Sequence, residues 1–102
     1  MNADEIKMTL KNFLDNSDRL KAYPAKFKLK VCAWFYLAAK FERGRRYTEK
    51  EVNAILNEWH TFNDWALLRR MLYDGRFFNR MSDCSYYWLE ENQPTLNDFN
   101  LS

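Results

Sequence analysis

The sequence contains few of the residues that build catalytic and metal sites. It has one histidine, His60, and two cysteines, Cys32 and Cys84, with no CxxC pair and no Cys/His spacing typical of zinc. It also has two glycines and no glycine-rich phosphate loop. We therefore expect no enzyme, no cofactor and no metal. We expect both cysteines to be free thiols, with a disulfide between them as the alternative.

Long apolar runs are absent as well. No segment approaches the roughly 18 continuous apolar residues of a membrane span, and residues 1–5 lack the basic start and apolar core of a secretory signal. This pattern predicts a cytoplasmic protein. Hydrophobic residues nevertheless make up 47% of the 102 residues and aromatic residues 18%, which is enough for one domain with a core of its own.

Charge is distributed unevenly along the chain. The segment from Arg19 to Arg46 contains nine basic residues and one acidic residue. Its net charge is therefore +8, in a chain whose total is +2. Such segregation indicates a partner with phosphates, although solvation of a long helix explains it equally well. The residues that we expect to contact a nucleic-acid backbone are Lys26, Lys28, Lys30, Arg43, Arg45, Arg46, Arg76 and Arg80.

Apolar residues recur at helical spacing in four segments. The predicted helices cover residues 4–15, 24–41, 49–59 and 64–74. Pro24 suits the first turn of the second helix, and Gly44 lies just beyond its end. Because this helix is apolar on two sides, we expect it to pack against two partners, the first helix and the rest of the domain, rather than a second copy of the chain.

Polar residues mark the ends of the third and fourth helices. Thr48 and Glu51 fit a capping box at the start of the third helix. Thr61 and Asn63 are the two candidate N-caps of the fourth helix. We expect Gly75 to end that helix as the left-handed residue that follows it.

The segments outside these helices predict a small sheet. Residues 45–47 form a short extended segment, and the aromatic runs 77–81 and 85–89 form a β-hairpin. The predicted fold is mainly α with a small β-hairpin, a winged helix-turn-helix with an additional N-terminal helix. We expect one domain over residues 1–89, with its core in 20–89, and an acidic, loosely attached tail over 90–102.

Four motifs then resemble a known family. The segments "PAKFKLKVCAWFYLAAKF", "GRRYTEKEVNAILNEWH", "LLRRMLYDGRFFNR" and "DCSYYWL" are similar, in this order, to the bacterial domain-of-unknown-function family 2087. The resemblance covers about residues 20–89. It implies a winged-helix module associated with transcription regulators, and hence a DNA-binding role by analogy.

Two features depart from the family pattern. The hairpin turn reads Asp83-Cys84-Ser85 where the family usually has Asp-Gly-Ser, so either a non-glycine residue adopts a left-handed conformation or the turn type changes. In addition, Leu29 and Phe35 replace residues that are usually charged. The second departure predicts an extra apolar patch.

The two adjacent arginines of the fourth helix receive different predicted roles. Arg69 lies at the edge of the buried stripe, where a guanidinium is suited to a structural contact with a carboxylate or with helix-end carbonyls. Arg70 lies on the outward stripe, where it can contact a guanine edge or a phosphate, or remain solvated. Asn63 and Thr61 could join it at the start of the helix.

Two partners therefore remain open. The first is DNA, held on one cationic platform that the basic residues form beside the helix preceding the hairpin. The second is another protein or a second copy, bound through the apolar residues Leu29, Phe35 and Leu67. The aromatic residues of the last strand could also stack on unpaired bases, but their spacing favours packing within the hairpin; they are Tyr86, Tyr87 and Trp88.

Overall fold

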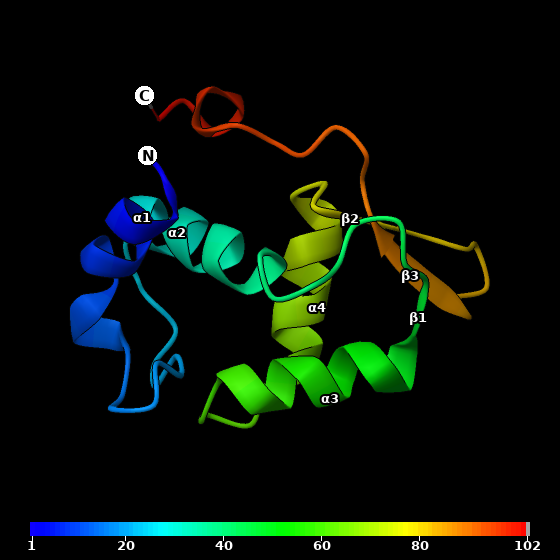
Figure 1. Cartoon of the computed structure of the whole chain (residues 1–102), viewed down its shortest axis with the longest axis horizontal. Helices are drawn as coiled ribbons and strands as arrows, with labels where there is room; N and C mark the ends of the chain where they lie inside the picture. Colours follow the sequence, from blue (N-terminus) through cyan, green and yellow to red (C-terminus); the bar gives the residue numbers. More distant parts are fainter. Residues whose placement is uncertain (102) are drawn as a thin grey trace.

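The structure is a computed structural model that describes residues 1–101. It is an α+β fold of four α-helices and one three-stranded antiparallel sheet, consistent with the predicted winged-helix arrangement (Figure 1). The helices are α1 (Ala3–Thr9), α2 (Phe27–Ala38), α3 (Glu49–Trp59) and α4 (Trp65–Asp74). The strands are β1 (Tyr47–Thr48), β2 (Phe78–Arg80) and β3 (Tyr86–Leu89), and two short 3-10 helices are η1 (Lys11–Phe13) and η2 (Leu96–Phe99).

The sheet has the order β1-β3-β2, so the last strand lies in the middle. Tyr47 pairs with Tyr87 on one side of β3, and Phe78 pairs with Leu89 on the other. In the hairpin turn, Cys84 has a φ of 63°, so a non-glycine residue does adopt the left-handed conformation. The Asp83 carboxylate steadies this turn by accepting a hydrogen bond from the backbone N–H of Ser85 at 2.9 Å.

Helix α2 packs on two sides, as its apolar pattern predicts. It contacts α1 on one side and α4 on the other, and Val31, Ala33 and Leu37 are fully buried. The predicted limits 24–41 were too wide. The helix begins at Phe27, because Lys26 is still extended with a ψ of 136°, and it ends at Ala38, well before Gly44.

The N-terminal segment is less helical than predicted. Instead of one helix over 4–15, α1 ends at Thr9 and a single 3-10 turn follows. Beyond it, Leu20 forms bridges to Leu14 and to His60. Its backbone N–H donates to the Trp59 carbonyl at 2.8 Å, and its carbonyl accepts from Thr61 N–H at 2.9 Å. The segment that precedes α2 is therefore tied to the turn between α3 and α4.

The start of α3 is confirmed and the start of α4 is corrected. Thr48 and Glu51 form the predicted capping box, and hydrogen bonding to Thr48 lowers the pKa of the Glu51 carboxyl. The N-cap of α4 is Asp64, not Thr61 or Asn63. Asn63 has a φ of 55°, so it forms the left-handed step of the turn and leaves capping to Asp64.

The end of α4 differs by one residue from the prediction. Gly75 is the C-cap with a φ of −79°, and Arg76 is the left-handed residue with a φ of 66°. The Phe77 N–H donates to the Leu72 carbonyl at 2.9 Å, which completes a Schellman motif. Position 75 favours glycine for space, because a Cβ there would lie 3.0 Å from the Met71 carbonyl oxygen and 3.1 Å from the Phe77 ring.

The acidic tail, expected to be loosely attached, packs on the domain. Figure 1 shows that it runs from β3 back across the molecule toward the side that carries α1 and α2. The Phe99 ring stacks on Phe77 with centroids 6.0 Å apart and meets Trp34 edge-on at 5.7 Å. The Gln93 side-chain amide donates to the carbonyls of Phe77 and Glu90 at 2.9 and 2.8 Å. The aromatic and amide side chains of the tail explain this packing, which the acidic charge of the segment does not predict.

His60 is the buried polar side chain of the core, with 2% of its surface exposed. Its Nδ1 lies 2.6 Å from the Leu56 carbonyl oxygen, and its Nε2 accepts a hydrogen bond from the Asp64 N–H at 2.9 Å. One ring therefore satisfies a carbonyl near the end of α3 and the N-cap N–H of α4. Both ring nitrogens of this histidine are therefore engaged in contacts that join α3 to the start of α4.

We expect His60→Leu to lower the free energy of unfolding by about 2 to 4 kcal/mol, because it leaves a buried N–H and a buried carbonyl without partners. Urea denaturation of the two proteins measures the difference. Thr61→Ala, at an exposed neighbouring position, is the control and should change the free energy by less than about 0.5 kcal/mol. Equal stabilities of His60→Leu and the parent would contradict the assigned hydrogen bonds.

We also expect Phe99→Ala to lower the free energy of unfolding by about 1 to 2 kcal/mol, roughly half the usual cost for a fully buried phenylalanine, because Phe99 is half-buried. Thermal or urea unfolding checks it. Asn97→Ala, on the exposed side of the same 3-10 helix, is the matched control. If Phe99→Ala and Asn97→Ala unfold at the same midpoint, the tail does not contribute to the fold.

Candidate nucleic-acid interface

The exposed side of α4 borders a groove of about 460 Å³ between α3, α4 and the hairpin. On α4 the exposed residues Ala66, Arg70 and Asp74 recur at intervals of four, so only a narrow stripe of this helix faces solvent. The rest of α4 packs against α3, α2 and β2. The groove is lined by Glu49, Ala66, Arg69, Arg70, Tyr73, Asp74, Arg80 and Tyr87.

Arg69 makes internal contacts. Its Nη2 lies 3.1 Å from the Glu49 carboxylate, its Nη1 donates to the Asn53 side-chain oxygen, and 20% of its side chain is exposed. Both partners belong to α3, so this guanidinium ties α4 to the helix that precedes it. Arginine suits this position because its planar guanidinium group can donate to two acceptors at once.

Arg70 lies in the open. Its side chain is 77% exposed, and its Nε is 3.6 Å from the carboxylate of Asp74, one turn further along α4. A solvent-exposed pair at this spacing contributes at most about 0.5 kcal/mol. An incoming phosphate or base edge can therefore displace Asp74 at little cost.

Arg80 extends from β2 toward α4. Its guanidinium lies 4.2 Å from the centre of the Tyr73 ring and donates to the Cys84 sulfur at 3.2 Å. Hydrogen bonding to the side chains of Tyr87 and then Tyr73 raises the pKa of Arg80 above its ordinary value. The hairpin thus supplies a second arginine to the groove that Arg70 of α4 also lines.

The other predicted backbone contacts do not form one platform. Lys26, Lys28 and Lys30 lie at the start of α2, whereas Arg43, Arg45 and Arg46 follow its end. The 12 residues of α2 give the helix a length of about 18 Å. The segment that follows it runs toward β1, away from the start of the helix (Figure 1). The expected single cationic surface therefore divides into a lysine group and an arginine group, defined by these residues.

The arginine group has contacts within the protein. Arg45 lies 3.4 Å from the Glu51 carboxylate, and the Arg46 guanidinium lies 5.3 Å from the centre of the Trp88 ring. Arg43 donates to the Glu91 carbonyl at 3.2 Å. Arg76 lies apart, in a hollow that it shares with Asp74 and Asp98. These positions leave Arg46 and Arg70 as the more open guanidinium groups near the sheet and α4.

The start of α4 offers less to an anion than expected. Thr61 and Asn63 are exposed in the turn before the helix. The Asp64 carboxylate already accepts a hydrogen bond from the Leu67 N–H at 3.3 Å and places a negative charge at this helix end. A phosphate bound there would have to replace it.

Sequence reasoning missed two basic residues with structural roles. Arg19 donates to the carbonyls of Asn57, Glu58 and His60 at 3.1, 3.1 and 2.8 Å, which caps the end of α3. Lys40 lies 3.9 Å from the centre of the Trp59 ring, and burial lowers its pKa. The carbonyls that Arg19 binds and the Trp59 ring that Lys40 contacts are distant in sequence, so no local motif identifies these contacts. Both were counted in the basic stretch that suggested a nucleic-acid surface.

The residues of the predicted apolar patch lie in separate places. Phe35 packs edge-on against Phe77 at 4.9 Å and against Phe99 of the tail at 6.1 Å. Leu29 and Leu67 are half-buried on α2 and α4. The tail therefore covers part of the surface that suggested a protein partner.

A family model described as "Uncharacterized protein conserved in bacteria (DUF2087)" matches residues 19–89. The chain belongs to this family. No curated protein and no solved structure matches it. The region matched to DUF2087 runs from α2 to β3 and contains every residue of the groove, whereas α1 and the tail lie outside it.

Two structural observations accompany this assignment. None of the helices within residues 1–101 is long and apolar enough to cross a membrane. In the same part of the chain, no three histidine, cysteine or acidic side chains gather as metal ligands would, and both cysteines are free.

The two arginines of α4 should respond differently to the same substitution. We expect Arg69→Gln to lower the free energy of unfolding by about 1 to 2 kcal/mol, because Glu49 and Asn53 lose a charged, half-buried partner. Arg70→Gln should change it by less than about 0.5 kcal/mol. Urea denaturation of the pair measures this, each variant serving as the other's control. A larger loss for Arg70→Gln would reverse the assignment.

Proposed function

We propose that this DUF2087 domain binds duplex DNA as a winged-helix protein and that it acts as a transcriptional regulator. The observation that carries the proposal is the groove that Arg70 of α4 and Arg80 of the hairpin both line. Support also comes from the order of elements, in which two helices joined by a tight turn are followed by a hairpin, the order of DNA-binding winged helices.

In this proposal α4 enters the major groove with its exposed stripe. Arg70 binds a phosphate or the O6 and N7 atoms of a guanine, and it exchanges Asp74 for that partner. The methyl group of Ala66 offers only an apolar contact, and Asn63 and Thr61 lie at the other end of the helix. Because a single arginine provides most of the base contact, we expect modest sequence preference.

Backbone contacts are assigned to the side of the molecule that carries the sheet. Arg80 reaches a phosphate beside α4, and the arginine group adds positive charge after the end of α2. The lysine group lies at the far end of α2 and receives no contact. This division turns the lysine group into an internal control, because its charge is equal in sign and it belongs to the same basic stretch of the sequence, residues 19–46.

We expect Arg70→Gln to weaken binding about tenfold, since one bidentate arginine contact contributes about 1 to 3 kcal/mol. Arg80→Gln should weaken binding to all duplexes equally. It should also lower, by about one, the number of phosphate contacts that the salt dependence of the binding constant reports. Fluorescence anisotropy with labelled duplexes of mixed sequence at low salt measures both. Lys28→Gln, an exposed residue of the lysine group, is the matched charge control and should bind like the parent.

Three results would contradict the proposal: no binding at micromolar protein, binding that salt does not weaken, or equal losses for Lys28→Gln and Arg70→Gln. Light scattering of the same samples then addresses the protein-partner alternative. A dimer without DNA binding would favour that alternative, and a monomer without DNA binding would favour neither.

A further inference from the structure

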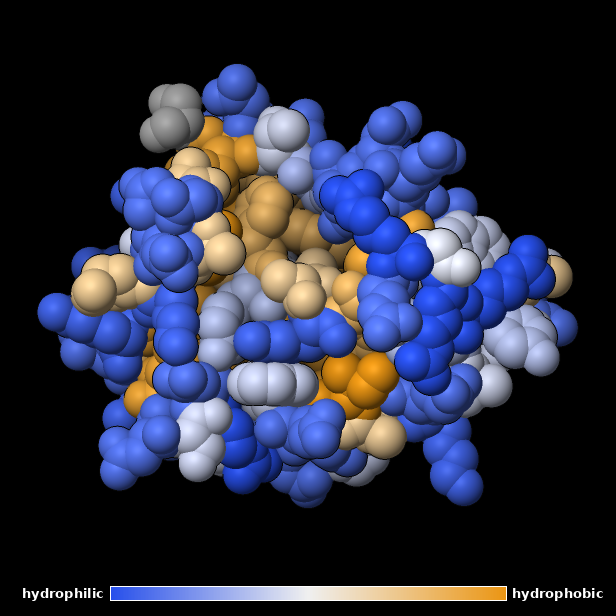
Figure 2. Space-filling model, in the orientation of Figure 1, coloured by the Kyte–Doolittle hydropathy of each residue, from blue (hydrophilic) through white to orange (hydrophobic). Residues whose placement is uncertain are grey.

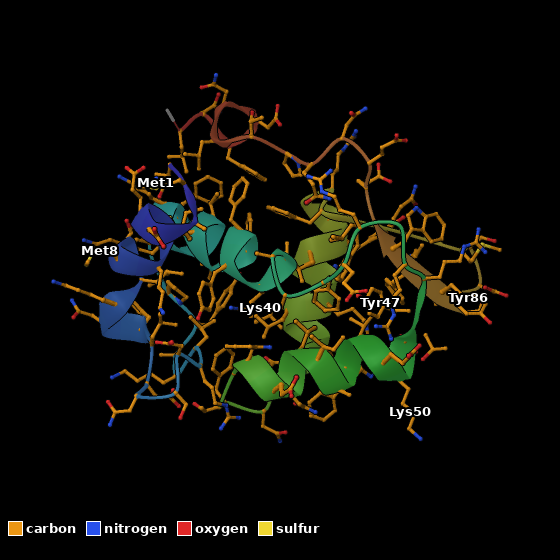
Figure 3. The ribbon with its side chains drawn as sticks, viewed as in Figure 1. Met1, Met8, Lys40, Tyr47, Lys50 and Tyr86 are labelled. Carbon is orange, nitrogen blue, oxygen red and sulfur yellow. The ribbon has the colours of Figure 1, made fainter. Side chains whose placement is uncertain are left out.

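The outer face of the sheet carries two aromatic side chains, the exposed Tyr86 and the half-buried Trp88. On β3, Tyr87 and Leu89 are buried, with 2% and 8% of their surface exposed. Tyr86 and Trp88 alternate with them and therefore lie on the other face of the strand. Tyr86 is 42% exposed, and Figure 3 shows it at the edge of the molecule, away from the buried Tyr47. We call Tyr86, Trp88 and their neighbours Thr48 and Asn79 the aromatic face.

Positive charge borders this face. The Arg46 guanidinium lies 5.3 Å from the centre of the Trp88 ring and is exposed. Among residues 1–101 it forms no ion pair with a carboxylate. Figure 2 shows the same end of the molecule, where pale residues of intermediate hydropathy lie among strongly hydrophilic ones. Arg46 is therefore free to bind an anion next to an aromatic ring.

A hollow opens beside Trp88. It measures about 490 Å³ and is lined by Arg43, Gly44, Trp88, Leu89, Glu90 and Glu91. Gly44 has a φ of 76°, and a Cβ there would have no atom within 4 Å, so this part of the loop is open. The tail leaves the sheet at this point and packs on Phe77 and Trp34, away from the aromatic face. Nothing else in residues 1–101 fills the hollow.

We propose that the aromatic face binds an unpaired strand of nucleic acid, with bases stacked on Tyr86 and Trp88 and phosphates held by Arg46 and Arg43. Aromatic rings beside arginines are the chemistry that binds single strands, because every base has a π face and every nucleotide has a phosphate. The groove beside α4 takes no part, and only Arg43 and Arg46 are shared with the backbone contacts proposed for a duplex, so the inference goes beyond the proposed duplex binding.

The spacing of the two rings favours an unpaired strand over a duplex. Tyr86 and Trp88 are two residues apart on a strand, a separation of about 6.6 Å. Stacked bases in a duplex rise by about 3.4 Å and present only their edges to a protein. A strand can use both rings only when its bases are unstacked. The carboxylates of Glu90 and Glu91 border the hollow and repel phosphates, which sets the end of the site.

Anisotropy titrations of labelled oligo(dT) and oligo(rU), about 15 nucleotides long, test the inference on the whole protein at low salt. We expect Tyr86→Ala and Trp88→Ala each to weaken binding by about fivefold to a hundredfold, the loss that follows removal of one stacked base. Tyr86→Phe keeps the ring and should bind like the parent. Phe27→Ala is the matched control, because Phe27 is an exposed aromatic residue at the start of α2.

Arg70→Gln separates this site from the duplex site. It should leave oligo(dT) binding unchanged, whereas Tyr86→Ala should leave duplex binding unchanged. The inference is overturned if neither oligonucleotide binds at micromolar protein, if Phe27→Ala weakens binding as much as Tyr86→Ala, or if Arg70→Gln removes single-strand binding. Circular dichroism of each variant establishes that a loss of binding is not a loss of fold.

Discussion

The turn between α3 and α4 is the constraint on which the rest of the structure depends. Five residues, 60–64, join two helices there, and every buried backbone group in such a turn needs a partner. His60 supplies partners to both helices, Arg19 binds three carbonyls at the end of α3, and Leu20 pairs with backbone on both sides of His60. These contacts fix the direction of α4. They therefore also fix which of its residues face solvent and which arginine reaches the hairpin.

Local patterns predicted the elements whose determinants are local. The capping box and apolar spacing placed α3 at Glu49–Trp59 because Thr48, Glu51 and the buried stripe lie within one segment. The start of α4 was harder, since Asn63 and Asp64 are both good N-caps, and only the folded turn gives the left-handed position to Asn63 and the cap to Asp64. At the end of α4, the sequence predicted a positive φ at Gly75. In the structure position 75 favours glycine for a different reason, because Phe77 and the Met71 carbonyl lie too close for a Cβ.

Charge was the weaker guide to the candidate site, for a physical reason. A basic residue contributes the same to a count whether it faces solvent, as Arg70 does, or binds carbonyls and aromatic rings, as Arg19 and Lys40 do. The partners of Arg19 lie about forty residues away, so only the fold brings them together. The basic stretch also includes α2, whose length holds its two ends apart. Net charge in a sequence window therefore predicted a cationic character but not a shared surface.

Strand β3 connects the two surfaces for which we propose functions. Its side chains alternate, so Tyr87 lines the groove beside Arg80 while Tyr86 and Trp88 face the opposite side. A ligand on one face cannot contact the side chains of the other, because the backbone of a three-stranded sheet lies between them. The two faces are therefore separable by substitution, even though neighbouring residues of one strand build them. The buried side of the sheet is held by edge-on ring contacts, in which Phe41 meets both Tyr47 and Phe78, and Phe78 meets Tyr87.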